Sequence, residues 1–304
     1  MKFVCLMMVI IAHTLYRSSG DVGMESIRFC CLCFTMPMFF FMSGMVSKIK
    51  SFGQTFRKSV RHLLIPCIVF SLIYNILLQY INPGFRPRYD IPGFAMWYLW
   101  VLFLYRLSLP LLNRIPYIVP ISFVVALCVP MVPWIGNRFG LCRIACFLPY
   151  YLLGYKLRDV KWPRLSNFRI ILGWGSLCLI FAIWIVFIHV YPGHTYRTAF
   201  NSAFNGDPIH GVLLQTALIG TICITGSLVW LLIPDRLLWF TKYGERTLTV
   251  YLLHGLIVLP TAYCLFRPFS EESMIGRIEM ILIPTLICLI LFNEKLNKYI
   301  SRLF

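Results

Sequence analysis

Long apolar segments separated by short polar ones recur from the first residues of this chain to the last. An apolar run of about 17–25 residues has the length of a helix that crosses the hydrocarbon core of a bilayer. The pattern predicts ten such spans, near residues 3–16, 26–46, 63–81, 94–112, 115–133, 141–157, 170–191, 211–233, 248–266 and 275–293. Because only helices satisfy their own backbone hydrogen bonds in lipid at these lengths, we expect an all-α fold, a polytopic bundle of about ten transmembrane helices.

The polar segments between these runs are short. None is long and polar enough to fold as a soluble domain, so we expect a single membrane-embedded domain over residues 1–304. The opening run is not a cleaved signal peptide, because no small-residue cleavage pattern follows it and the chain continues directly into a second apolar run. The segment NPGFRPRYDIPG, residues 82–93, is rich in proline and glycine and predicts ordered turns rather than a further helix.

Composition supports a membrane protein. Hydrophobic residues make up 59% of the chain and charged residues 13%, against roughly 45–50% and about 25% in soluble domains. This balance excludes an ordinary soluble domain. Most of the twelve cysteines lie inside apolar runs, where a free cysteine behaves as a small hydrophobic residue. We therefore expect neither a metal site nor a disulfide framework.

The net charge of +17 is explained best by membrane topology. The basic residues lie in short loops between apolar runs rather than in polar patches interleaved with aromatic residues, which argues against nucleic-acid binding. Placing the N-terminus in the cytoplasm puts about two-thirds of the 28 lysine and arginine residues on the cytoplasmic side, as the positive-inside rule favours. We expect both termini to be cytoplasmic and the segments near 82–92, 191–210 and 267–274 to face the periplasm or cell exterior.

His13 is the first candidate for chemistry, because it lies near the end of the opening apolar run in the stretch VIIAHTLY. Ionisable side chains inside a membrane are costly and usually line a functional cavity. Lys2 precedes His13 by eleven residues, or about 16 Å along a helix, so one helix would carry a cation at the cytoplasmic edge and an imidazole near mid-membrane. The alternative is a histidine that hydrogen-bonds to the backbone of a neighbouring helix, and the residues alone favour neither.

A cluster of basic residues follows the second expected span: Lys48, Lys50, Arg57, Lys58 and Arg61. The last three share one face of a helix if this segment is helical, and such a face suits the phosphates of an anionic cofactor. The positive-inside rule accounts for the same residues without any ligand, and on the residues alone this second interpretation is favoured.

The Lys2-to-His13 spacing is followed, in order, by PMFFFMSGM (37–45), FRKSVRHLLIP (56–66), MWYLWVLFL (96–104), FLPYYLLGYKLR (147–158) and GERTLTVYLLHG (244–255). Together they resemble the acyltransferase-3 family of integral-membrane O-acyltransferases, in particular its short members that are similar to fucose O-acetyltransferases. Taken in the same order, the spacing and the five segments are similar to the family's Arg-x10-His motif, aromatic-Ser-Gly segment, basic loop, and Trp-Tyr-Leu, Phe-x-x-Gly and Tyr-Leu-Leu-His segments. Two departures are Lys2 in place of the arginine, and Thr35 where the family often has a histidine.

The resemblance implies an O-acetyltransferase that moves an acetyl or other acyl group from acetyl-CoA to a sugar hydroxyl of a cell-surface polysaccharide or its lipid-linked precursor. It implies that His13 is catalytic, either as a general base or as a nucleophile that carries the acetyl group. Lys2, Lys58 and Arg61 would bind acetyl-CoA, which is a substrate and not a permanently bound cofactor. The implied location is a bacterial inner membrane.

Four further residues are candidate substrate contacts: Glu25, Ser43, Arg143 and His254. We expect Glu25 to lie in a loop after His13, where it would orient that histidine, bind an acceptor hydroxyl, or pair with a nearby arginine. Arg143, three residues into the sixth expected span, would stabilise an oxyanion or, as we favour, extend to the outer interface. His254 lies inside the ninth expected span and would orient substrate or form a structural hydrogen bond to a neighbouring helix.

The first expected span is short, since the residues from Phe3 to Tyr16 extend about 21 Å as a helix against a hydrocarbon core of roughly 30 Å. Either this helix is half buried among the others, or residues that precede it are missing. The resemblance favours the second explanation, because family members usually carry an acidic and a basic residue before the position of Lys2. We therefore expect the N-terminus to be truncated.

Two other classes of protein fit the same pattern. A transporter or flippase also has many spans and intramembrane charges, but the two halves of this chain show no convincing internal repeat. A non-catalytic scaffold in a polysaccharide assembly complex is the third possibility.

Overall fold

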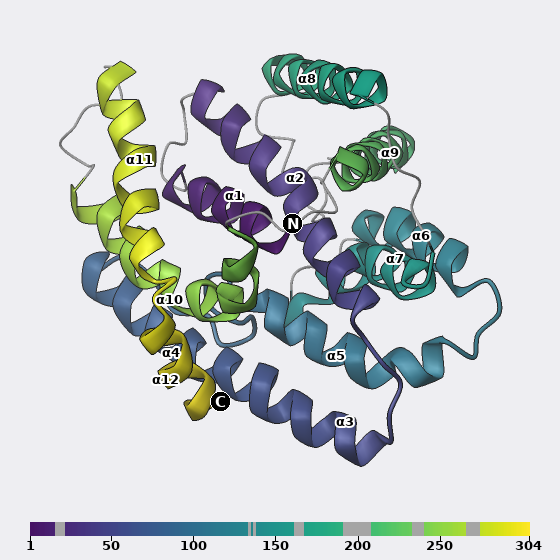
Figure 1. The fold of residues 1–304 in the computed structure, drawn as a ribbon, viewed down its shortest axis with the longest axis horizontal. Coiled ribbons are helices and arrows are strands. Elements are labelled where there is room, and N and C mark those ends of the chain that lie inside the picture. Colours follow the sequence, from purple (N-terminus) through teal and green to yellow (C-terminus); the bar gives the residue numbers. More distant parts are fainter. Residues whose placement is uncertain are drawn as a thin grey trace. The chain divides into compact units, whose positions relative to one another are not determined.

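The computed structural model describes residues 1–15, 22–132, 135, 138–160, 167–190, 208–232, 240–265 and 274–304. In this part the regular secondary structure is helical and includes no strand (Figure 1), which confirms the all-α prediction. Three described helical segments are long and apolar enough to cross a membrane, Gly23–Met45, Phe52–Ile81 and Gly211–Leu232, and shorter apolar helices accompany them. The count of ten spans and the orientation of the termini stay predictions.

Each expected apolar run coincides with a helix. These helices are α1 (Lys2–Thr14), α2 (Val22–Met45), α4 (Ile65–Ile81), α5 (Trp97–Leu112), α6 (Ile118–Cys128), α7 (Leu141–Leu157), α8 (Asn167–Val190), α9 (Pro208–Leu232), α10 (Thr247–Pro260) and α11 (Met274–Ile290). As expected, residues 82–93 contain turns and no helix.

Two sequence-based expectations were wrong at helix boundaries. Glu25 does not lie in a loop, because α2 begins at Val22 and places this carboxylate in its first turn, where a negative charge is favourable. The basic cluster is not confined to a loop either. Arg57 and Lys58 lie on α3 (Phe52–Ser59), and Arg61 lies on the π-helical segment η2 (Val60–Leu64), which continues into α4.

The described helices form two compact units, which are treated separately. Unit 1 consists of Met1, Leu32–Lys48 and Leu109–Leu238, and unit 2 consists of Lys2–Cys31, Ile49–Ser108 and Trp239–Phe304. Helices α2 and α5 contribute residues to both units.

Helix α10 is the centre of unit 2, where it packs against α1, α4, α11 and the C-terminal helix α12 (Glu294–Leu303) (Figure 1). Its buried residues cover most of the helix surface, whereas Leu256 on the remaining side is exposed. Among them are Val250, Leu252, His254, Val258 and Leu259, none of which has any exposed surface. A polar imidazole is therefore enclosed at the centre of an apolar bundle.

Helix α1 packs against α10 and α11 along one face. The buried residues Cys5, Leu6, Val9 and Ile10 recur at the spacing of a helical stripe, whereas Lys2 and Val4 are exposed. This stripe fixes the rotation of α1 about its axis, and it determines which way His13, one turn beyond Val9, is directed.

Helix α12 was not expected from the apolar pattern, because it is short and amphipathic. Asn293 caps it by accepting a hydrogen bond from the backbone nitrogen of Lys295 at 2.8 Å. Arg246 donates to the backbone oxygen of Phe292 at 2.8 Å and to Glu294 at 3.2 Å. The hydrogen bond from Lys298 to Glu294, together with the nearby charge of Arg246, lowers the pKa of the Glu294 carboxyl.

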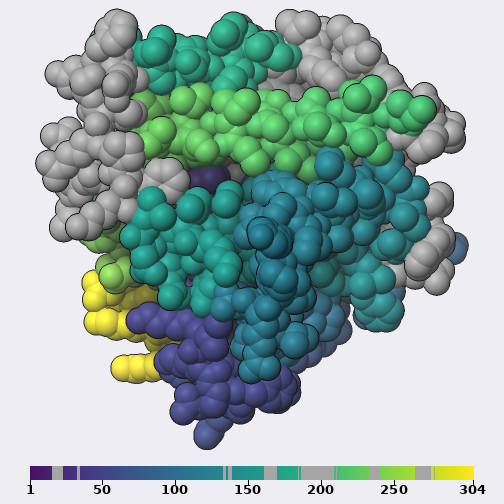
Figure 2. All heavy atoms as spheres, turned by 90° about the vertical axis from the view of Figure 1, so that its right-hand side faces the viewer, coloured from purple at the N-terminus to yellow at the C-terminus, as the bar shows by residue number. Residues whose placement is uncertain are grey.

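In unit 1, α6 packs against α7 and α9, and α9 packs against α8. Figure 2 shows α9 as a continuous ridge with α8 along one side and α6 along the other. The end of α2 contacts α7, where the hydroxyl of Tyr151 donates to Ser47 at 2.9 Å and the Phe40 and Phe147 rings stack 5.1 Å apart.

Candidate active site

The two histidines that the sequence placed inside apolar runs meet in unit 2. Nδ1 of His13 on α1 lies 3.0 Å from Nε2 of His254 on α10, a hydrogen-bonding distance. The two ring planes differ by only 14°, and the ring centroids lie 5.2 Å apart. The centroid distance exceeds the nitrogen distance by roughly two ring radii, so the rings lie end to end and nearly coplanar. This is the geometry of an in-plane hydrogen bond rather than of face-to-face stacking.

His254 is held by its own helix. Its Nδ1 lies 2.7 Å from the backbone oxygen of Tyr251, and the side chain has no exposed surface. The Tyr251 hydroxyl donates to the backbone oxygen of Ala95, which ties α10 to the segment that precedes α5. His254 therefore has a fixed position, and His13, which is half-buried, meets it from α1.

An aromatic wall covers the histidine pair. The ring of Phe94 lies 4.7 Å from that of His13, 5.6 Å from that of His254 and 5.3 Å from that of Tyr74. Tyr74 on α4 donates its hydroxyl to the backbone oxygen of Leu252. Phe94 has a φ of 46°, which is unfavourable for a bulky residue. Such backbone strain concentrates at functional sites, where the surrounding structure holds it in place.

Gly255 allows this wall to reach α10. A Cβ atom at this position would lie 2.6 Å from Cε1 of Tyr74 and 2.8 Å from Cε1 of Phe94. We expect Gly255→Ala to displace both rings and to cost about 1–3 kcal/mol in stability from overpacking. Thermal unfolding in detergent measures the effect. Gly53→Ala, at a position with open space on α3, is the matched control. Equal thermal midpoints for the two variants would contradict the contact of Tyr74 and Phe94 with α10 at Gly255.

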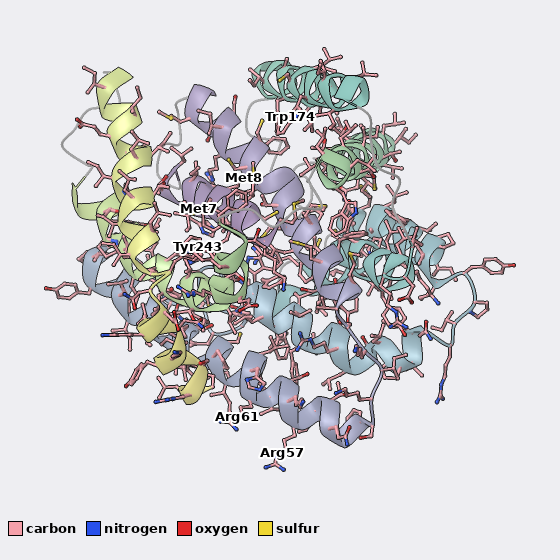
Figure 3. The ribbon with its side chains drawn as sticks, viewed as in Figure 1. Met7, Met8, Arg57, Arg61, Trp174 and Tyr243 are labelled. Atoms are coloured by element: carbon pink, nitrogen blue, oxygen red, sulfur yellow. The ribbon has the colours of Figure 1, made fainter. Side chains whose placement is uncertain are left out.

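The candidate donor-binding residues lie on the surface of unit 2. Lys2, Lys58 and Arg61 are all exposed, Lys2 at the start of α1 and the other two on α3 and η2. Figure 3 shows Arg57 and Arg61 extending outward from the same side of this helical segment, in keeping with the expected shared face. Nε of Arg61 donates to the backbone oxygen of Phe304 at 3.0 Å.

A second group of cations, which the sequence pattern did not predict, lies near the start of α1. The Phe3 ring lies 5.8 Å from the ring of Tyr243, which is labelled in Figure 3. Nζ of Lys242 lies 5.2 Å from the centroid of that ring, and the Arg246 guanidinium lies 5.7 Å from it. Lys242 and Arg246 thus lie around an aromatic side chain that contacts the residue next to Lys2. Periodicity could not indicate this, because these residues are far from Lys2 in sequence.

The other three candidates have different surroundings. Glu25 is half-buried on α2 in unit 2, on the same helix as Arg28, whose charge acts on His13. Ser43 and Arg143 belong to unit 1, where both are half-buried. The backbone oxygen of Ser43 accepts a hydrogen bond from Ser47 at 2.7 Å, and Arg143 lies in the first turn of α7. The structure thus brings His13 and His254 together directly, and the roles of the other candidates stay predictions.

Comparison with known proteins identifies the family. The family model of the acyltransferase domain of the acyltransferase-3 family matches residues 1–293. The chain belongs to the acyltransferase-3 family. This membership and the apolar helices make it an integral membrane protein with the domain of a membrane acyltransferase. No curated protein and no solved structure matches the chain. Within the described residues of this acyltransferase, no group of three or more His, Cys, Asp or Glu side chains is arranged to hold a metal ion.

Proposed function

We propose that this acyltransferase-3 protein is an O-acetyltransferase that moves the acetyl group of acetyl-CoA to a sugar hydroxyl of a cell-surface polysaccharide or its lipid-linked precursor. The proposal includes a bacterial inner-membrane location, about ten spans and cytoplasmic termini. The observation that carries it is the hydrogen-bonded pair of half-buried His13 and buried His254 in a chain of this family, because an imidazole is well suited to accept a hydroxyl proton near pH 7.

The chemistry at His13 is a proton transfer coupled to acyl transfer. His13 accepts the proton of the sugar hydroxyl as its oxygen attacks the thioester carbonyl, the carbon–sulfur bond breaks, and coenzyme A leaves as a thiolate that takes up a proton. In the alternative order, His13 first takes the acetyl group and then passes it to the sugar oxygen. Both routes need one imidazole nitrogen that carries a lone pair and is accessible to substrate.

Acetyl-CoA is an anion, and the exposed cations of unit 2 suit its phosphates. Arg61 presents a planar guanidinium with several donors, and Lys58 provides a neighbouring point charge on the same helical segment. Lys2 begins the helix that carries His13, about 16 Å away along the helix axis. A donor bound by Lys2 at the membrane surface would thus contact the same helix that carries the imidazole.

Radiolabel transfer tests the proposal. Membranes that contain the full chain are incubated with acetyl-CoA labelled in its acetyl group and with bacterial polysaccharide or its lipid-linked sugar precursors. We expect alkali-labile label to accumulate in the glycan only when the chain is present. No transfer, together with chain-dependent movement of the precursor across vesicle membranes, would favour a transporter. No transfer and no movement would favour a scaffold.

Removal of the surface cations is expected to weaken binding of the donor more than the chemistry. Lys58→Ala and Arg61→Ala should each raise KM for acetyl-CoA roughly 5–30-fold with kcat nearly unchanged, as loss of one charge-assisted hydrogen bond predicts. The increase should shrink at high salt, because screening already weakens these contacts in the parent protein. Lys295→Ala, which removes an exposed cation on α12, is the control. Unchanged KM values in both variants would place the donor elsewhere.

A further inference from the structure

The hydrogen bonds of His254 determine which of its nitrogens carries the proton. The backbone oxygen of Tyr251, 2.7 Å from Nδ1 of His254, can only accept a hydrogen bond. Nδ1 of His254 must therefore donate and carry a hydrogen. In the neutral imidazole the other nitrogen, Nε2, is then an acceptor with a lone pair.

The same argument extends to His13. Because Nε2 of His254 accepts, Nδ1 of His13, 3.0 Å away, must donate. The small interplanar angle of 14° directs this N–H along the lone pair of the partner ring. In neutral His13 the remaining nitrogen, Nε2, carries a lone pair, and it makes no hydrogen bond to any residue within the described part of the chain. The opposite tautomer of His13 would place two lone pairs against each other.

We propose that His254 is a positioning residue that holds His13 in the tautomer whose Nε2 is free to accept a proton or an acyl group. The inference rests on the proposed function and goes beyond it, because it names which nitrogen reacts and what orients it. When Nε2 of His13 gains a proton or an acyl group, its Nδ1–H becomes a donor on a cationic ring. The hydrogen bond to His254 then becomes charge-assisted and stronger. The Tyr251 oxygen, His254 and His13 thus form one chain of hydrogen bonds that ends at the reacting atom.

His254 would orient His13 as a carboxylate orients the histidine in other catalytic groups. In those groups, loss of the orienting carboxylate leaves the histidine in the wrong tautomer. Here the acceptor is a neutral imidazole inside an apolar bundle. A buried carboxylate in the same place would carry a much larger desolvation cost. The enclosed position of His254, with no exposed surface, is consistent with a residue that acts through His13 and never contacts substrate.

Two substitutions at one position separate positioning from packing. His254→Gln keeps an acceptor oxygen that can reach His13, and His254→Leu keeps comparable volume without an acceptor. We expect His254→Leu to lower kcat roughly 10²–10⁴-fold with KM for acetyl-CoA unchanged, and His254→Gln to retain kcat within about tenfold of the parent. Both variants should reach the parent's abundance in the membrane. In a His13→Ala background, His254→Leu should cause no further loss.

A spectroscopic readout keeps this inference separate from the proposed function. In protein labelled with nitrogen-15 at histidine, the signals lost in His13→Ala should report a protonated Nδ1 and a bare Nε2, and His254→Leu should shift them towards a protonated Nε2. A bare Nδ1 of His13 in the parent, or parental kcat in a well-expressed His254→Leu, would overturn the inference. So would a His254→Gln as inactive as His254→Leu at equal abundance. If the parent transfers no acetyl group but the tautomer is as stated, the proposed function fails and the positioning role of His254 in fixing that tautomer stands.

Discussion

His13→Ala is expected to remove acetyl transfer, with a fall in kcat of roughly 10³-fold or more at unchanged abundance in the membrane. General acid–base catalysis by one positioned side chain contributes about 10²–10⁴-fold, and loss of a nucleophile costs at least as much. The effect should fall on kcat, because His13 lies beside His254 and Phe94, whereas Lys58 and Arg61 are on other helical segments and Lys2 is at the opposite end of α1. Label transfer from acetyl-CoA to glycan, normalised to protein in the membrane, measures it.

Val4→Ala provides the control on the same helix. Val4 is 40% exposed and contributes little to the packing of α1, so its replacement should leave both abundance and transfer unchanged. His13→Gln adds a second test, because it keeps a polar side chain of similar size but no basic nitrogen. Parental activity in either His13 variant would contradict the catalytic role of His13 and leave the imidazole as a packing residue of unit 2.

The same variant separates the two routes for the acetyl group. If His13 carries the acetyl group, incubation with labelled acetyl-CoA and no sugar should leave one label on the protein, and His13→Ala should abolish it. Kinetics with both substrates should then follow a ping-pong pattern. If His13 acts as a general base, no labelled protein accumulates and both substrates must be bound before coenzyme A is released.

The helices were predictable because apolar runs of membrane length have few alternatives. The errors occurred at polar positions next to these runs. Glu25 was assigned to a loop because it interrupts the apolar pattern, yet a carboxylate in the first turn of α2 is compatible with a helix. Helices α3 and α12 were not predicted as elements, because a short amphipathic helix at a membrane surface does not give a long apolar run.

The site was predictable residue by residue but not as an arrangement. An imidazole inside an apolar run identified both His13 and His254, since such residues are rare in a membrane. Their pairing joins positions 241 residues apart, and periodicity carries no information about which helices are neighbours. The alternative in which His13 hydrogen-bonds to the backbone of a neighbouring helix was wrong, because its hydrogen bond goes to another imidazole. The catalytic alternative stays a prediction. The wall residue Phe94 was missed because it follows a segment of turns, where no pattern distinguishes one aromatic ring from another.

The second large effect is expected in unit 1, where two glycines allow α2 and α7 to touch through their backbones. A Cβ on Gly44 would clash with the backbone oxygen of Tyr151 and lie 2.8 Å from the backbone nitrogen of Tyr155. A Cβ on Gly154 would clash with the backbone oxygen of Phe41. Small residues at helix crossings in membranes permit this close packing, and backbone atoms cannot move aside as a flexible side chain does.

Gly44→Ala and Gly154→Ala should therefore each push the two helices apart and destabilise unit 1 by about 1–3 kcal/mol, which lowers the thermal midpoint by several degrees. Separation of the helices would also weaken the hydrogen bond from Tyr151 to Ser47 at 2.9 Å. The double variant should lose less than the sum of the single losses, because both substitutions open the same crossing. Thermal unfolding of the full chain in detergent measures each effect. Gly220→Ala on α9, where an added Cβ meets nothing within 4 Å, is the matched control, and a Gly154→Ala midpoint equal to that of the control would show that α2 and α7 do not cross in this way.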